Sequence, residues 1–92
     1  MDAQQIVALV KESIGIKHTA RDTYLTAIVE GVIKELEYEK GLALDSANPY
    51  HLMFCVDFAR FRYDNHGQGV MPRHLQYRLH NLVIKIGGSP HV

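Results

Sequence analysis

The segment from Tyr24 to Leu36 constrains the fold more than any other part of the chain, because its apolar residues come in pairs every four positions. The residues of this pattern are Tyr24, Leu25, Ile28, Val29, Val32, Ile33 and Leu36. Such spacing follows the turn of an α-helix and not the alternation of a strand, and it places one apolar stripe on one face. Glu30, Lys34 and Glu37 lie on the opposite, polar face. The segment therefore predicts an amphipathic helix that packs on other elements.

Capping and stop residues predict where this helix and its neighbours begin and end. Asp2 is placed to cap a first helix that Gly15 ends. Thr19 and Asp22 resemble a capping box for the second helix, with Asp in place of Glu, and Gly41 marks its expected end. The expected helices are residues 3–13, a segment ending near residue 41, residues 49–64, and a segment beginning near residue 72.

The third helix is expected at the centre of the fold or in part at a contact with another subunit. Asn48 and Pro49 predict its start, as an N-cap followed by a proline in the first turn. Its sequence, YHLMFCVDFARFRY, is apolar nearly all round, which is typical of a helix surrounded by protein. Its mainly polar strip consists of Met53, Asp57, Arg60 and Asp64.

The fourth helix follows a turn over residues 65–69, where two glycines and an asparagine favour left-handed backbone. It begins near Pro72, and its expected core stripe is Leu75, Leu79, Leu82, Val83 and Ile86. Its reverse face carries Arg73, Tyr77, His80 and Ile84, for which the sequence implies no partner in the chain. The expected fold class is all-α: a single small bundle of about four helices over residues 1–86, with a flexible C-terminal tail over 87–92.

The composition indicates one globular domain without a strong net charge. Of its 92 residues, 47% are apolar and 22% are charged, which favours a folded domain over a disordered chain. Ten Lys/Arg and ten Asp/Glu cancel, which disfavours a domain that coats DNA. Residues 1–46 carry five Lys/Arg and eight Asp/Glu, a net −3, whereas residues 47–92 carry five Lys/Arg and two Asp/Glu, a net +3. Copies of the molecule can therefore stack acidic end to basic end, although chance produces the same segregation.

Residues that could carry chemistry have simpler explanations. The chain has a single cysteine, Cys55, so it cannot form an intramolecular disulfide, and this fits a cytosolic setting. Cys55 lies among apolar residues, so we expect it to be a core residue. His74 and His80 share a predicted helix, but six positions apart they are not aligned, so exposure to solvent is expected. No phosphate-binding glycine motif, nucleophile elbow, secretory leader or membrane-spanning run occurs. We therefore expect no catalysis, cofactor, metal site, membrane association or small-molecule substrate.

Arg62 is the most informative charged residue, because it shares a helix sector with Cys55 and Phe58. An unpaired guanidinium buried there would be costly, so it is expected either to be paired inside the protein or to be presented at an interface. Glu35 and Glu39 are the expected partners within the chain. The alternative is an arginine whose guanidinium extends to water.

Residues 49–86 also allow an alternative function, that of a small DNA-binding packaging or regulatory protein. The third and fourth helices would form a helix-turn-helix, with Arg73, His74, Gln76 and Arg78 entering a groove. The joining turn is long for that motif, and the neutral total charge gives it no support.

Three segments together resemble the small head-tail connector, or adaptor, proteins of tailed phages and prophages. They are VKESIGI, ARDTYLTAIVEGVIKEL and FARFRYDNHGQGVMP, and the resemblance extends over about residues 7–83. It consists of a first helix ending near a short break, a second opening with an acidic residue, and an aromatic helix ending in Arg-Tyr-Asp before a Gly-x-Gly turn. Gln68 stands where many relatives have an acidic residue, so the role of that side chain is not carried over.

The resemblance implies a structural protein that forms an oligomeric ring between the portal and the tail. Its partners would be copies of itself, the portal protein and tail-completion proteins, with DNA only passing through the ring. The expected location is the head-tail junction of the virion, and the host cytoplasm before assembly. Arg62, Tyr63, Asn65, Gly67 and Gly69 would build the turn. The full set of expected interface residues is Arg60, Arg62, Asp64, Asn65, Gly67, Gly69, Arg73, Tyr77 and Ile84.

Overall fold

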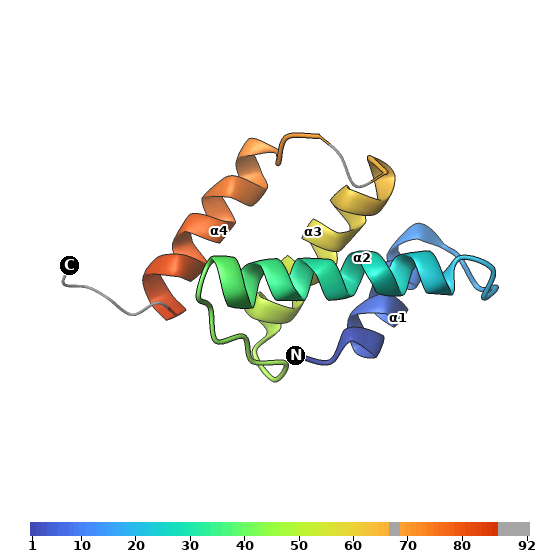
Figure 1. The fold of residues 1–92 in the computed structure, drawn as a ribbon, viewed down its shortest axis with the longest axis horizontal. Coiled ribbons are helices and arrows are strands. Elements are labelled where there is room, and N and C mark those ends of the chain that lie inside the picture. Colours follow the sequence, from blue (N-terminus) through green and yellow to red (C-terminus); the bar gives the residue numbers. More distant parts are fainter. Residues whose placement is uncertain (67–68, 87–92) are drawn as a thin grey trace.

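The computed structural model describes residues 1–66 and 69–86, the last two by their backbone alone. Its elements are α1 (Ala3–Ile14), α2 (Asp22–Lys34), the π-helical turn η1 (Glu35–Glu39), α3 (Pro49–Asp64) and α4 (Arg73–Ile86). The described residues contain no strand, so the all-α prediction is confirmed (Figure 1). The expected flexible tail over residues 87–92 lies outside the described residues.

The predicted ends of α1 are confirmed. The Asp2 carboxylate accepts a hydrogen bond from the backbone N–H of Gln4 at 3.0 Å, which satisfies one of the free donors at the start of the helix. Gly15 adopts left-handed backbone with φ 89°, and its N–H donates to the carbonyl of Lys11 at 2.8 Å. Glycine takes this conformation without steric cost, which explains why the helix ends there.

The predicted capping box of α2 is wrong. The helix begins at Asp22, after Arg21, and no side chain caps it. The Asp22 carboxylate instead binds the Lys11 ammonium of α1 at 2.7 Å. A carboxylate next to an ammonium group gains a charge-assisted hydrogen bond, which is stronger than one to a neutral backbone N–H. This ion pair ties the start of α2 to the end of α1.

The second helix ends in a π-helical turn that the sequence did not predict. Over Glu35–Glu39 the backbone widens, while Leu36 stays fully buried. The chain leaves the turn at Gly41 with φ 67°, so the predicted end near this glycine is confirmed. The backbone N–H of Leu42 donates to the carbonyl of Leu36 at 3.0 Å, which returns the next residues to the core.

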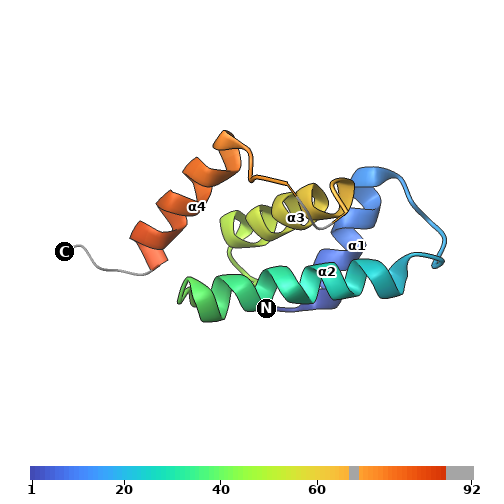
Figure 2. The same cartoon turned by 45° about the horizontal axis from the view of Figure 1, so that its top comes forward.

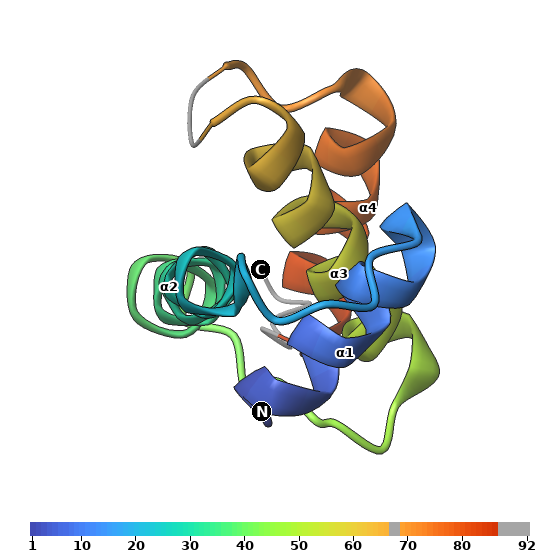
Figure 3. The same cartoon turned by 90° about the vertical axis from the view of Figure 1, so that its right-hand side faces the viewer.

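The third helix is central, as its sequence predicts. Asn48 caps it by accepting from the N–H of Tyr50 at 2.9 Å, and Pro49 occupies the first turn. α1, α2 and α4 all pack against it (Figure 3). Its buried residues are Phe54, Cys55, Val56, Phe58 and Ala59.

The fourth helix projects from the rest of the bundle. Among the helices in the described part of the chain, α4 lies only against α3 (Figure 2). Leu75 and Leu82 are buried and Leu79 packs on the core, as predicted, but Val83 is 39% exposed and its assignment to the core was wrong. A helix with a single neighbour buries a narrow strip, and Val83 lies beside that strip. Nothing is described of the side chain of Ile86.

Candidate functional site

The part of the expected interface on α3 is held mainly by bonds within the chain. The Arg60 guanidinium donates to the carbonyl of Ser13 at 3.2 Å and lies 3.6 Å from the Asp64 carboxylate. Asn65 follows the helix, and its side-chain amide donates to the carbonyl of Phe61 at 2.8 Å. Arg60, Asp64 and Asn65 are all exposed, so these bonds fix their positions and leave surface available to a partner.

The turn after α3 contains left-handed backbone, as its composition predicts. His66 has φ 54°, which is uncommon outside glycine, and Gly69 has φ 98°. A Cβ on Gly69 would approach the ring of Phe61 at 3.6 Å, an ordinary contact, so the backbone angle and not the space requires glycine. Gly67, another expected interface residue, and Gln68 lie outside the described residues.

Arg62 is paired inside the protein. Its guanidinium donates to the Glu35 carboxylate at 2.9 Å and lies 4.7 Å from the centre of the Phe58 ring. Both partners of this ion pair are about three-quarters buried, with side-chain exposures of 29% and 25%. The predicted partner Glu35 is confirmed, and Glu39 is not used. Arg62 therefore ties α3 to η1.

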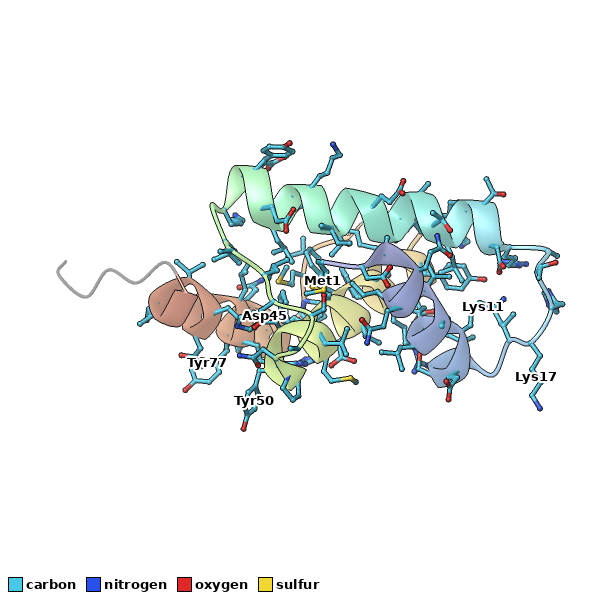
Figure 4. The ribbon with its side chains drawn as sticks, turned by 90° about the horizontal axis from the view of Figure 1, so that it is seen from below. Met1, Lys11, Lys17, Asp45, Tyr50 and Tyr77 are labelled. Carbon is cyan, nitrogen blue, oxygen red and sulfur yellow. The ribbon has the colours of Figure 1, made fainter. Side chains whose placement is uncertain are left out.

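The outer face of α4, formed by Arg73, Tyr77, His80 and Ile84, points away from the core. Tyr77 is 67% exposed and Ile84 53% exposed, and Arg73 and His80 are exposed as well. The spacing of these residues by four, three and four positions aligns them opposite Leu75 and Leu82. Figure 4 shows Tyr77 projecting from the helix on the same side as Tyr50. The predicted exposure of this face is confirmed.

The charges of α4 are all basic. Its sequence, RHLQYRLHNLVIKI, contains three Lys/Arg, two histidines and no acidic residue. Arg78 is already bound to the Asp57 carboxylate of α3 at 2.7 Å and lies over the Phe54 ring. Of the basic residues expected to enter a DNA groove, Arg78 thus has a role within the fold, while Arg73 and His74 are exposed.

A cleft of about 650 Å³ separates the loop before α3 from α4. Its lining residues are Ala43, Asp45, Asn48, Tyr50, His51, Phe54, Arg78, Asn81 and Leu82. Two of its polar side chains already act within the chain: His51 accepts a hydrogen bond from the N–H of Asp45 at 3.1 Å, and Arg78 binds Asp57. This cleft could not be predicted from the sequence, because the segments that form it are distant in the chain.

Cys55 is a core residue, as predicted. Burial, together with the charge of Glu37, raises the pKa of its thiol from 9.0 to about 12. Since the thiolate is the reactive form, this thiol is a poor nucleophile near neutral pH. Within residues 1–66 and 69–86 no three metal-ligating side chains gather at one place. None of the helices there has the length and apolar character needed to span a bilayer.

The outer face of α2 and η1 was overlooked by the sequence reasoning. Gly31 is exposed in the middle of α2, and no atom of another element lies within 4 Å of where its Cβ would be. Glycine there costs roughly 0.5–1 kcal/mol relative to alanine, and no contact with the described residues requires it. Glu37 and Glu39 lie at the carboxyl end of the helix, where the helix dipole disfavours negative charge. An exposed helical glycine and acidic residues at a helix carboxyl end both lower the stability of the fold. We therefore regard this face of α2 and η1 as a candidate contact surface.

No known protein family, characterised protein or solved structure matches this chain. Its surfaces and its sequence motifs are therefore the basis for assigning a function.

Proposed function

We propose that this chain is a structural head-tail connector of a tailed phage or prophage, and that it works as a subunit of an oligomeric ring between portal and tail. The observation that carries the proposal is the outer face of α4. An aromatic, an aliphatic and an arginine side chain are exposed in one line there, on a helix that packs against one other helix of the described residues.

These residue types are the ones that anchor protein interfaces. Tyrosine and arginine contribute much of the binding energy in many complexes, and each keeps a polar group that can be satisfied at the rim of a contact. A single exposed apolar residue is ordinary, but Tyr77 and Ile84 lie on one helix face with Val83 at its edge. The face is therefore suited to a neighbouring subunit or the portal.

The resemblance of three sequence segments to connector proteins supports a particular kind of assembly, a ring between portal and tail. In such a ring the partners are further copies, the portal and tail-completion proteins, and DNA passes through the channel. The turn between α3 and α4, with Asn65 and Gly69, would lie beside the outer face of α4 in the same contact. The location that follows is the head-tail junction of the virion.

The alternative, DNA binding through residues 49–86, has less support from the charges. Arg78 is engaged by Asp57, and the residues on the outer face of α4 include Tyr77 and Ile84 in place of further cations. Affinity for duplex DNA that falls steeply with salt would favour this alternative, since phosphate contacts release counterions.

The test is a double variant, Tyr77→Ala with Ile84→Ser. Neither side chain belongs to the core, so helicity and thermal midpoint should stay close to those of the parent. Ring formation, measured by analytical ultracentrifugation and electron microscopy, and incorporation into virions should be lost.

The matched control is Tyr50→Ala with Met53→Ser, which removes an exposed aromatic and an exposed flexible side chain from the surface of α3. The control should assemble like the parent. If the control loses assembly and the α4 variant keeps it, the interface lies on α3 and the proposal for α4 is refuted.

A further inference from the structure

Two helical surfaces of the molecule carry opposite charge, and no helix of the described residues packs on either of them. Residues 22–39, which form α2 and η1, contain five Asp/Glu and one Lys. The fourth helix contains three Lys/Arg, two histidines and no acidic residue. In the described residues α2 and α4 do not pack on each other, and they lie on different sides of α3 (Figure 3). One chain therefore cannot bring these two surfaces together.

Part of this charge is already used inside the fold. Asp22 binds Lys11, Glu35 binds Arg62, and Arg78 binds Asp57. The exposed charges left on the outer face of α2 and η1 are Glu30, Glu37 and Glu39 against one cation, Lys34, whose ammonium lies 5.3 Å from the centre of the Tyr38 ring. On α4 the exposed arginine is Arg73, and the helix contains no acidic residue. The charge complementarity thus remains after the internal ion pairs are removed, and it belongs to exposed side chains.

We propose that the outer face of α4 docks, antiparallel, on the outer face of α2 and η1 of a second copy. This inference rests on the proposed function, since it names the surface that receives α4 in the ring. A contact between two different surfaces of the same protein is heterologous, and it closes into a ring when the rotation between neighbours permits. Each copy would offer one surface and receive the other.

The antiparallel direction follows from charge. The amino end of α4, with Arg73, carries the positive end of its helix dipole. The carboxyl end of α2 and η1, with Glu37 and Glu39, carries the negative end. Placing these ends together pairs both the side-chain charges and the dipoles, whereas a parallel arrangement would place Arg73 at the amino end of α2.

The two faces have the same residue spacing in this direction. Arg73 and Ile84 are eleven positions apart, and so are Ala27 and Tyr38 on the receiving helix. With Arg73 beside Tyr38 and Ile84 beside Ala27, the side chain of His80 falls opposite Gly31. The absence of a side chain on Gly31 would let the imidazole approach the backbone closely, which accounts for an exposed glycine that no contact among residues 1–66 and 69–86 requires.

The first experiment is a charge exchange between Arg73 and Glu37. Arg73→Glu alone and Glu37→Arg alone each place like charges together, and each should weaken self-association by about tenfold or more. The variant with both changes, and an equimolar mixture of the two single variants, should regain association close to that of the parent. Glu12→Arg, which changes an exposed glutamate of α1 by the same charge, is the control and should have little effect. Association is measured by sedimentation over a wide concentration range.

The second experiment tests the close approach at Gly31. Gly31→Leu should abolish association while the circular dichroism and thermal midpoint remain those of a folded chain, because no atom in the described part of the chain lies within 4 Å of the position of its Cβ. Gly31→Ala should keep the fold and reduce association less than leucine does. Full association of the leucine variant would overturn the docking proposal.

The outcomes separate this proposal from the proposed function. One result is that the parent protein assembles while association is regained neither by the Arg73→Glu, Glu37→Arg variant nor by the mixture of the two single variants. That result refutes docking of α4 on α2 and leaves the connector function standing. A chain that stays monomeric at every concentration also refutes the docking contact. Absence of the protein from virions, by contrast, refutes the connector function, whatever the charge exchange shows.

Discussion

Phe58→Ala should be among the most damaging single substitutions in this protein. The Phe58 side chain is 1% exposed, its ring centre lies 5.8 Å from that of Phe54, and the Arg62 guanidinium covers it at 4.7 Å. Truncating a buried phenylalanine costs about 3–5 kcal/mol, through lost burial and the cavity left behind. A domain of this length has a total stability of roughly 5–14 kcal/mol, so the change removes a large share of it.

The assay is thermal and urea denaturation followed by circular dichroism. A loss of that size should lower the thermal midpoint by roughly 12 °C or more, since each kcal/mol shifts a domain of this size by about 4–8 °C. Phe61→Ala makes the same chemical change on the same helix at a half-buried position, and it should cost less. A midpoint for Phe58→Ala within a degree or two of the parent would show that this side of α3 is not core.

Two further predictions concern the helix caps and the cysteine. Asp2→Ala should lower the free energy of unfolding by about 1 kcal/mol, because it removes the cap of α1. Thr19→Ala should change it by less than about 0.5 kcal/mol, because no capping box forms at α2. Urea denaturation of the two variants measures both changes. Because the pKa of the Cys55 thiol is raised from 9.0 to about 12 on folding, its contribution to stability is present below pH 9 and lost as the pH rises towards 12. A native chain that reacts with thiol reagents at pH 8 as fast as an unfolded one would refute this burial.

Much of the helical layout could be predicted from local signals. The residues that cap or end a helix contact backbone groups only a few positions away, so their roles can be recognised without knowing the tertiary structure. They are Asp2, Gly15, Asn48 and Pro49. The central place of α3 was predictable because a helix that is apolar on nearly all sides needs neighbours on nearly all sides. The pairing of Arg62 was predictable for a similar reason, since a charge in an apolar sector requires a partner.

The features that were missed depend on neighbours distant in the chain. Asp22 has the spacing of a capping residue, but Lys11 of another helix competes for its carboxylate. Val83 and Tyr24 fit an apolar stripe, yet how much of a stripe is buried depends on how many helices cover it. Gly31 is unremarkable in the sequence, and its exposed place on α2 becomes visible only in the fold. The exposed face of α4 could be predicted from the sequence, but not that α3 is the one helix of the described residues against which α4 lies.

The most direct test of the proposed connector function is the mass of the particles that the purified chain forms, alone and mixed with a phage portal protein. Mass photometry and electron microscopy should show a closed ring whose mass is a whole multiple of the 10.4 kDa chain and which is lost in the Tyr77→Ala, Ile84→Ser variant. A chain that remains a 10.4 kDa monomer at every concentration, and does not bind the portal, would contradict the account.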